Sequence, residues 1–442
     1  MSLKVESQTA QSFREKGDEL KSNGQFALAI EQYEKALNLD PKLVPVLREL
    51  GEIHKNLGQL DEAISCYEKA ISCKPQNAGL YARLGDILKK RGHLEEAISH
   101  YLKAIQTDPS FLLPYRRLKY ARIKPSQFDE AIACYRHAIE NHPQASLNSY
   151  IRLGDLLTKQ GHLEEAIDCY KNASYQRNLA SHPDFVQKYW NSKQLGQPNF
   201  IIIGVGKCGT TALSNYLDKH PKVLPSVEKE LHFFNRDFAY GKKWYKSHFP
   251  PIPKKRSEFV TGEATPWYFN TLGVEERIFK LFPNIKLILI LRNPIDRALS
   301  QYNMHIEQGR NLHSFEEEMR AEMKELKDIL SSSDPKLDRT KLEKGCLGRG
   351  IYIYFLEKWM SLFPQEQLLI LKSENLKNEP ALTMMNVFEF LGLSDHPTLE
   401  YKKHNSRSYS PMSNDLRETL SNFFKPYNQK LEDYTNTEFN WK

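Results

Sequence analysis

The sequence has few cysteines and no long apolar run, and these absences exclude several classes of protein. Six cysteines among 442 residues are too few and too scattered for a disulfide framework, and none forms a CxxC pair. Because no run of about 18 apolar residues occurs, we expect no membrane-spanning helix. Residues 1–13 lack the apolar core of a signal peptide, which predicts a cytoplasmic protein.

A marked excess of one charge is also missing. The chain has 62 basic and 55 acidic residues, a formal net charge of +7, and neither half forms a basic arm. Nucleic-acid binding is therefore not expected. The composition, with 40% hydrophobic and 26% charged residues, is that of an ordinary globular protein. The length predicts about three domains.

The N-terminal part of the chain repeats every 34 or 35 residues. Each copy contains an Ala-Ile pair followed by a tyrosine, and in four of the five copies a glycine precedes the pair. A second glycine lies further upstream in every copy except the fourth, where Lys119 replaces it. The pairs are Ala29-Ile30, Ala63-Ile64, Ala97-Ile98, Ala131-Ile132 and Ala166-Ile167.

This pattern resembles the tetratricopeptide repeat, in about five copies over residues 10–180. Small residues let two antiparallel helices approach closely, and glycine ends the first helix in a left-handed conformation. The resemblance implies an all-α superhelix that binds a protein partner, recruits the acceptor of an enzyme, or dimerises. Residues 181–197 break the period, and we interpret them as a cap or linker whose aromatic residues cover the last repeat.

The fourth unit carries a basic stretch. Its residues are Arg116, Arg117, Lys119, Arg122 and Lys124. Two interpretations stay open: a solvated helix face, or a docking patch for an acidic partner.

A different pattern begins at residue 198. Residues 200–203 predict a short buried strand, residues 212–217 predict a helix, and the glycine-rich loop GVGKCGTT joins them. A loop of this kind before a helix N-terminus forms a cradle for phosphate or sulfate, because backbone N–H groups and the helix dipole both favour an anion. Its lysine precedes the glycine, so the Gly-Lys-Ser/Thr order of a Walker A loop is absent. That absence counts against a nucleotide kinase or NTPase.

The segment GVGKCGTTALSNYLDKHP resembles the 5′-phosphosulfate loop of sulfotransferases, especially the heparan-sulfate type. The resemblance covers about residues 198–430. It implies an α/β, P-loop-like domain over 198–442 with a central parallel sheet, and 3′-phosphoadenosine 5′-phosphosulfate (PAPS) as co-substrate without a required metal. The loop residues that would bind PAPS are Gly206, Lys207, Cys208, Gly209, Thr210 and Thr211.

Later segments extend the resemblance. Arg292 and Ser300 correspond to the residues that hold the 3′-phosphate in the family. Ser406 and Arg407 stand where the family has a basic loop that closes over the cofactor, although the usual Lys-Gly is here Asn405-Ser406. The segment GRGIY at 348–352 resembles the Ser-Arg-Gly-x-Tyr segment of the family.

Catalysis of sulfuryl transfer needs cations at the leaving oxygen and a base at the acceptor. The resemblance assigns Lys207 to the leaving phosphate and Glu263, in the segment GEATPWY, to the base. Lys229 is a candidate for the sulfuryl oxygens, and His232 for a second base or a packed core histidine. His305 is left open between a catalytic and a structural role.

The sequence therefore predicts a two-domain sulfotransferase, with a tetratricopeptide superhelix followed by an α/β domain. The predicted reaction moves the sulfuryl group of PAPS to a hydroxyl or amine, and the heparan-sulfate-type motif favours a carbohydrate acceptor. The alternative is a catalytically inactive, sulfotransferase-like scaffold that acts through its repeats.

Overall fold

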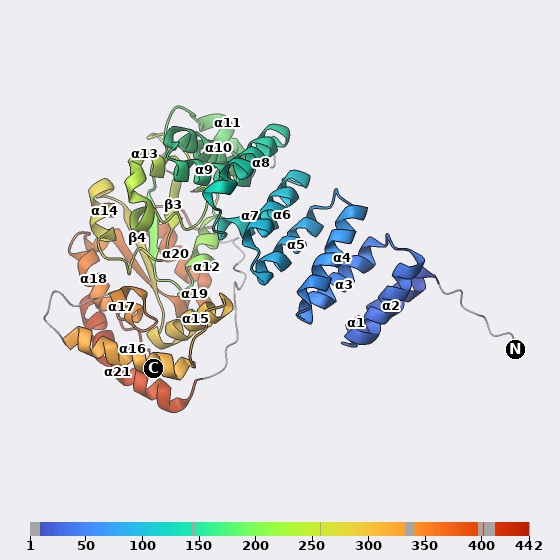
Figure 1. Cartoon of the computed structure of the whole chain (residues 1–442). Coiled ribbons are helices and arrows are strands. Elements are labelled where there is room, and N and C mark those ends of the chain that lie inside the picture. The colour runs from blue at the N-terminus through green and yellow to red at the C-terminus, as the bar shows by residue number, and fades with distance from the viewer. Residues whose placement is uncertain are drawn as a thin grey trace. The chain divides into compact units, whose positions relative to one another are not determined.

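The chain folds into two compact units, shown in the computed structural model of Figure 1. The structure describes residues 9–143, 146–256, 258–331, 340–396, 401 and 412–441. The first unit ends at Gln176 and the second begins at Arg177. The boundaries predicted at 180 and 197 stay predictions. Over the described ranges, no helix combines the length and the apolar character needed to cross a membrane.

The first unit consists of helix pairs that follow one another along the chain (Figure 1). The first helices of the pairs are α1 (Ala10–Ser22), α3 (Val44–Asn56), α5 (Ala78–Arg91), α7 (Leu112–Lys119) and α9 (Leu147–Gln160). The second helices are α2 (Phe26–Leu39), α4 (Leu60–Cys73), α6 (Leu94–Thr107), α8 (Phe128–Asn141) and α10 (Leu163–Ser181). The predicted array of helical repeats is confirmed.

A glycine–tyrosine contact closes the helix pair in four of these units. A Cβ atom on the first-helix glycine would lie only 2.5–2.8 Å from the ring of a buried tyrosine in the second helix. The pairs are Gly17 and Tyr33, Gly51 and Tyr67, Gly85 and Tyr101, and Gly154 and Tyr170. Each tyrosine hydroxyl donates to the acidic residue after the glycine, at 2.6–3.1 Å. Only glycine permits this close packing.

The fourth unit departs from this arrangement. Lys119 stands at the glycine position, and α7 ends there after 8 residues, whereas the other first helices have 13 or 14. Tyr135 stays fully buried, so the lysine cannot lie against its ring as a glycine does. Tyr120 occupies the acidic position, and the Tyr135 hydroxyl has no hydrogen-bond partner among the described residues. A buried hydroxyl without a partner costs about 1–3 kcal/mol.

The second unit is built on a five-stranded parallel sheet, as predicted, with strand order β2-β3-β1-β4-β5. The strands are β1 (Phe200–Gly204), β2 (Val223–Pro225), β3 (Val260–Ala264), β4 (Lys286–Leu291) and β5 (Leu368–Lys372). Apolar residues, chiefly isoleucine and leucine, dominate β1 and β4 because helices cover parallel sheets on both faces. Figure 1 shows the strands enclosed by helices.

Helices of varied length surround this sheet. They are α11 (Pro183–Tyr189), α12 (Thr210–Leu217), α13 (Gly241–Lys246), α14 (Val274–Leu281), α15 (Pro294–Glu307), α16 (Phe315–Ser331), α17 (Thr340–Lys344), α18 (Tyr352–Met360), α19 (Ser373–Asn378), α20 (Pro380–Leu391) and α21 (Asn414–Thr435). The predicted start of α15 is confirmed, since the Asn293 side chain caps the helix and Pro294 is its first residue. In α11, the Phe185 ring lies 4.9 Å from the Phe259 ring, so the predicted linker packs on this unit.

The strand order creates a switch point between β1 and β4. These strands are neighbours, but the chain leaves β1 toward β2 on one side and leaves β4 toward β5 on the other. In open α/β sheets, ligands bind in the crevice at the carboxyl ends of two such strands. The fold therefore brings the loop after β1 and Arg292 after β4 to one place.

We expect Gly85→Ala to destabilise the repeat array. The added Cβ would lie 2.7 Å from the Tyr101 ring, and overpacking of this kind costs about 1–3 kcal/mol. Hydrogen exchange of α5 and α6 in the full chain measures the loss. Lys89→Ala, at an exposed site on the same helix, is the control. Equal protection in both variants would contradict the close-packing account.

Candidate functional site

The glycine-rich loop bends sharply between β1 and α12. The Val205 N–H donates to the Ile290 carbonyl at 3.0 Å, which ties the loop to β4. Lys207 and Gly209 then adopt positive φ angles of 74° and 99°, and Gly209 is the N-cap of α12. The first N–H groups of a helix have no acceptor within it, so the start of α12 offers donors to an anion.

Two arginines after β4 hold the carbonyl groups of this loop. Arg292 Nη1 donates to the Lys207 carbonyl at 3.3 Å. Arg297 Nη1 donates to the Gly206 carbonyl at 3.4 Å, and its Nη2 donates to the Cys346 carbonyl. Arg297 is fully buried. The sequence does not single out Arg297, because nothing in a helical pattern tells a buried arginine from an exposed one.

Positive charge accumulates around the loop. The Arg349 guanidinium lies over the Trp267 ring, 4.1 Å from its centre, and burial lowers the pKa of Arg349 to about 9. Burial and then the nearby cations, Lys207 among them, lower the pKa of His305 to about 4. His305 is therefore neutral at pH 7 and a weak base. A site with this surplus of positive charge favours a bound anion.

Cys208 lies on the inner side of the loop. Its thiol is fully buried, 3.9 Å from the Tyr352 hydroxyl, and burial raises its pKa to about 11. Its N–H donates to the Val205 carbonyl at 3.2 Å. Tyr352 in turn donates to the Arg292 carbonyl at 2.7 Å. Cys208 is thus part of the loop's interior, and the ligand contact predicted for it stays a prediction.

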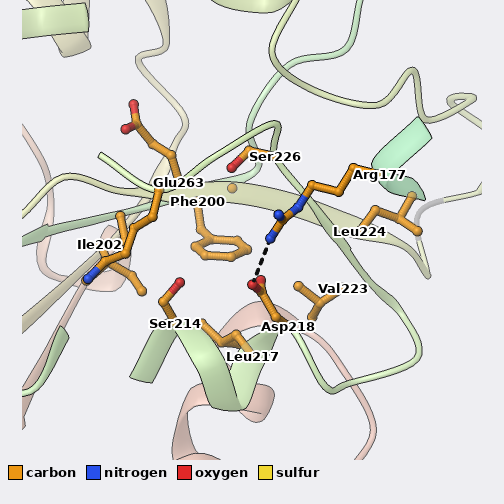
Figure 2. Close-up of a pocket in the computed structure, with 13 residues that line it drawn as sticks. Arg177, Phe200, Ile202, Ser214, Leu217, Asp218, Val223, Leu224, Ser226 and Glu263 are labelled. Atoms are coloured by element: carbon orange, nitrogen blue, oxygen red, sulfur yellow. Dashed lines mark hydrogen bonds and ion pairs between the residues drawn. The ribbon is translucent and has the colours of Figure 1, made fainter. Parts of the chain in front are cut away.

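Lys229 reaches the start of α12, and its predicted contact with the sulfuryl oxygens stays a prediction. Its Nζ donates to the Thr211 hydroxyl at 2.6 Å. Lys229 also lines a small pocket that runs beside α12 (Figure 2). There, Arg177 lies 3.4 Å from Asp218, and burial raises the pKa of Asp218 while Arg177 and Lys229 lower it.

Glu263 is a buried acceptor of three hydroxyl groups. Its side chain is only 3% exposed. Tyr245 and Tyr268 donate to Oε1 at 2.7 and 3.1 Å, and Thr265 donates to Oε2 at 2.6 Å. Burial raises the pKa of Glu263. Figure 2 shows its carboxylate pointing away from Phe200 and Ser214. These contacts make Glu263 a structural link between β3 and its surroundings, and its catalytic role stays a prediction.

Glu230 is the more accessible carboxylate. It adopts a φ of 63°, and its side chain is 38% exposed. Its two oxygens lie 3.7 Å from Lys229 Nζ and 3.8 Å from His232 Nε2. His232 also has a positive φ, 56°, and its Nδ1 lies 3.3 Å from the Asn235 side-chain oxygen. Glu230 was missed as a site residue, although it follows Lys229 directly in the segment that the sequence analysis singled out.

Of the remaining predicted cofactor-binding residues, some are buried and others lie outside the described residues. Thr210 is buried at the start of α12, and Ser300 is buried on α15, the helix that follows Arg292. Ser406 and Arg407 lie outside the described residues. Throughout the described ranges, no group of three or more His, Cys, Asp and Glu side chains is arranged to hold a metal ion.

Comparison with known proteins identifies both units. The sulfotransferase domain family matches residues 197–434. Tetratricopeptide repeat families match residues 17–58, 51–92, 78–111 and 147–176.

Curated relatives come from animals and an amoeba. The membrane-associated sulfotransferase kil1 of Dictyostelium discoideum is 29% identical over 57% of this chain and 68% of its own length. The mouse heparan sulfate glucosamine 3-O-sulfotransferase 3B1 is 31% identical over 57% of this chain and 66% of its own. The mouse bifunctional heparan sulfate N-deacetylase/N-sulfotransferase 3 is 31% identical, and the chain spans only 29% of it.

A bacterial crystal structure is also similar. The sulfotransferase from Alicyclobacillus acidocaldarius is 26% identical and covers 55% of this chain and 98% of its own, with a TM-score of 0.45. Since the family match spans more than half of the 442 residues, the chain belongs to the sulfotransferase domain family and carries tetratricopeptide repeats in its N-terminal part.

Proposed function

We propose that this chain transfers the sulfuryl group of PAPS to a hydroxyl or amine of a carbohydrate acceptor. The observation that carries the proposal is the loop at the switch point, whose carbonyl groups are held by Arg292 and Arg297 while Lys207 stands at its turn. Family membership supports sulfuryl transfer, and two of the relatives are named for heparan sulfate. PAPS would supply the activated sulfuryl group.

The residues around the loop suit a donor with two anionic groups, a 5′-phosphosulfate and a 3′-phosphate. Lys207 and the N-terminus of α12 would bind the 5′-phosphosulfate, and Arg292 would bind the 3′-phosphate beside the buried Ser300. Lys207 would also stabilise charge on the leaving phosphate oxygen, which is where charge develops during the transfer. Lys229, which donates a hydrogen bond to Thr211, would contact the sulfuryl oxygens.

Glu230 is the base that the geometry favours. A general base must reach the acceptor proton, and Glu230 is partly exposed beside Lys229 and His232. Glu263 is buried, and both of its oxygens already accept hydroxyl groups. We therefore assign proton removal to Glu230, with His232 orienting its carboxylate. Glu263 would stabilise the segment that carries Trp267, the ring on which Arg349 lies.

The repeats would act by binding a protein. Tetratricopeptide arrays present extended surfaces built from successive units. Such a surface would bring the enzyme to its acceptor or to an assembly that contains it.

The arginine after β4 should decide donor affinity. Arg292→Ala removes a guanidinium from the proposed 3′-phosphate site, and a hydrogen bond to a charged group contributes about 1.5–3 kcal/mol. Calorimetric titration with 3′,5′-ADP should therefore show affinity falling by at least about tenfold, while binding of 5′-AMP changes little. Equal losses for both nucleotides would contradict the assignment. Failure of well-folded wild type to bind 3′,5′-ADP would favour the inactive scaffold.

Lys207→Ala should abolish most of the activity. Loss of a group that stabilises transition-state charge lowers kcat about 10²–10³-fold. Release of 3′,5′-ADP from PAPS in the presence of a heparosan-type acceptor measures the rate. Lys242→Ala, at a lysine that bonds the Leu281 carbonyl, serves as the control. Activity near the wild-type level in Lys207→Ala would contradict the role proposed for Lys207.

The two glutamates can be separated by isosteric substitution. Glu230→Gln should lower kcat by about 10²-fold or more, as expected for loss of a general base, and leave the thermal midpoint nearly unchanged. Glu263→Gln should instead lower the midpoint, because the amide cannot accept all three hydroxyl groups. The reverse pattern, with activity lost only in a stable Glu263→Gln variant, would return the base to Glu263.

A further inference from the structure

The fourth repeat unit ends a pattern of contacts that joins the second unit to the third and the third to the fourth. The first helices lie side by side, because Arg83 of α5 is 3.2 Å from Glu52 of α3, and Arg117 of α7 is 2.7 Å from Asp86 of α5. In each case the acidic residue after the packing glycine pairs with an arginine of the following unit. Tyr120 stands at that acidic position in the fourth unit, so the pattern stops there.

In the fifth unit, the arginine at the corresponding position pairs within its own helix. Arg152 of α9 has the position that Arg83 and Arg117 have in their units, but it pairs with Asp155 of its own helix. Behind the break, the Tyr135 hydroxyl is buried without a partner among the described residues. Natural sequences break a local rule most often where another requirement acts. The break in the fourth unit is therefore a candidate for function.

Unpaired positive charge gathers at this break. Helices α1 and α3 hold equal numbers of acidic and basic residues, whereas α7 has three basic residues and no acidic one. The last turn of α5 is also basic, and α5 contacts α7 through the ion pair of Asp86 with Arg117. Some of these cations have partners, as Arg117 does. Three others, Lys89, Arg116 and Arg122, are exposed and form no ion pair with any described residue.

An aromatic ring accompanies the cations. Tyr120 follows the last residue of α7 and is 80% exposed, with the Lys119 ammonium 5.9 Å from its ring centre. Among the described residues it is the most exposed of the large hydrophobic side chains. Exposed tyrosine together with arginine is the composition typical of protein-binding anchors.

We propose that Lys89, Arg116, Tyr120 and Arg122 form a docking site for a short acidic segment of a partner protein. We call these four residues the unit-four patch. An arginine guanidinium can donate two parallel hydrogen bonds to one carboxylate. The Tyr120 ring adds an apolar surface for the stems of the acidic side chains. The proposal is independent of the sulfuryl transfer proposed above, since the patch lies in the repeat array.

The charge around the unit-four patch favours a short segment over a long polyanion. The second helices begin with pairs of acidic residues, such as Glu95-Glu96 in α6 and Asp129-Glu130 in α8. Glu95 pairs with Lys124, which follows Arg122 by two residues in the chain. A long sulfated polysaccharide crossing several units would meet these carboxylates, whereas a short acidic peptide contacts only the cations.

Fluorescence anisotropy with labelled short oligoglutamate, at low and high salt, tests this proposal on the full chain. Wild type should bind oligoglutamate and not oligoglutamine, with affinity that falls as salt rises. Arg116→Glu with Arg122→Glu should weaken binding by at least about tenfold, and Tyr120→Ala should weaken it severalfold. Sulfuryl transfer to a small acceptor should be unchanged in both.

The matched control reverses the charge of two exposed lysines on second helices, Lys69→Glu with Lys103→Glu. It changes the net charge by the same amount as Arg116→Glu with Arg122→Glu. An equal loss in this control would reduce the effect to overall charge and overturn the proposal. Tighter binding of a heparin fragment than of oligoglutamate, sensitive to the same Arg116 and Arg122 substitutions, would also overturn it in favour of a glycan.

A repaired repeat gives a second, independent test. Lys119→Gly with Tyr120→Asp restores the glycine and the acidic residue found in the other units. It should increase hydrogen-exchange protection of α7 and α8, because the Tyr135 hydroxyl gains an acceptor, and it should weaken oligoglutamate binding. A repaired array that gains protection yet binds oligoglutamate as wild type does would show that the break serves no docking role.

Discussion

The second unit depends on a short run of backbone, the loop after β1, that gathers N–H groups and positive charge at one place. Like charges and aligned N–H groups gathered at one place oppose folding when no ligand is present. Arg292 and Arg297 offset this by holding the loop's carbonyl oxygens from the protein side. The parallel sheet supplies the remaining requirement, because only neighbouring strands with diverging connections bring the β1 loop and the β4 terminus together.

The site also separates two carboxylates by environment. One, at Glu263, accepts hydrogen bonds from three hydroxyl groups that anchor β3. The other, at Glu230, stands on a strained backbone beside Lys229 and His232. Residues with positive φ in this region are held by surrounding structure and not by local preference. The two glutamates differ because one is buried and the other is partly exposed. A sequence motif alone does not reveal this difference in exposure.

Periodicity and local chemistry made much of the molecule predictable. The repeat spacing, the strand–loop–helix pattern after residue 198 and the Asn293-Pro294 helix start each rest on short-range rules, and the structure bears them out. What could not be predicted depends on tertiary burial. Arg297 and Glu230 look like ordinary surface residues in the sequence, and Glu263 looks like an exposed base, because side-chain accessibility is set by segments far away in the chain.

The buried thiol in the loop has a chemical consequence for handling the protein. Only an exposed thiolate reacts readily with alkylating agents, and Cys208 is enclosed, with a pKa near 11. Cys66 and Cys73, both on α4, are only partly covered, and burial raises the pKa of Cys66, which leaves Cys73 as the more reactive of the two thiols. Maleimide dyes should consequently label the repeat array and leave the glycine-rich loop after β1 unmodified. A dye on α4 can then report on binding to the repeats without a change in that loop.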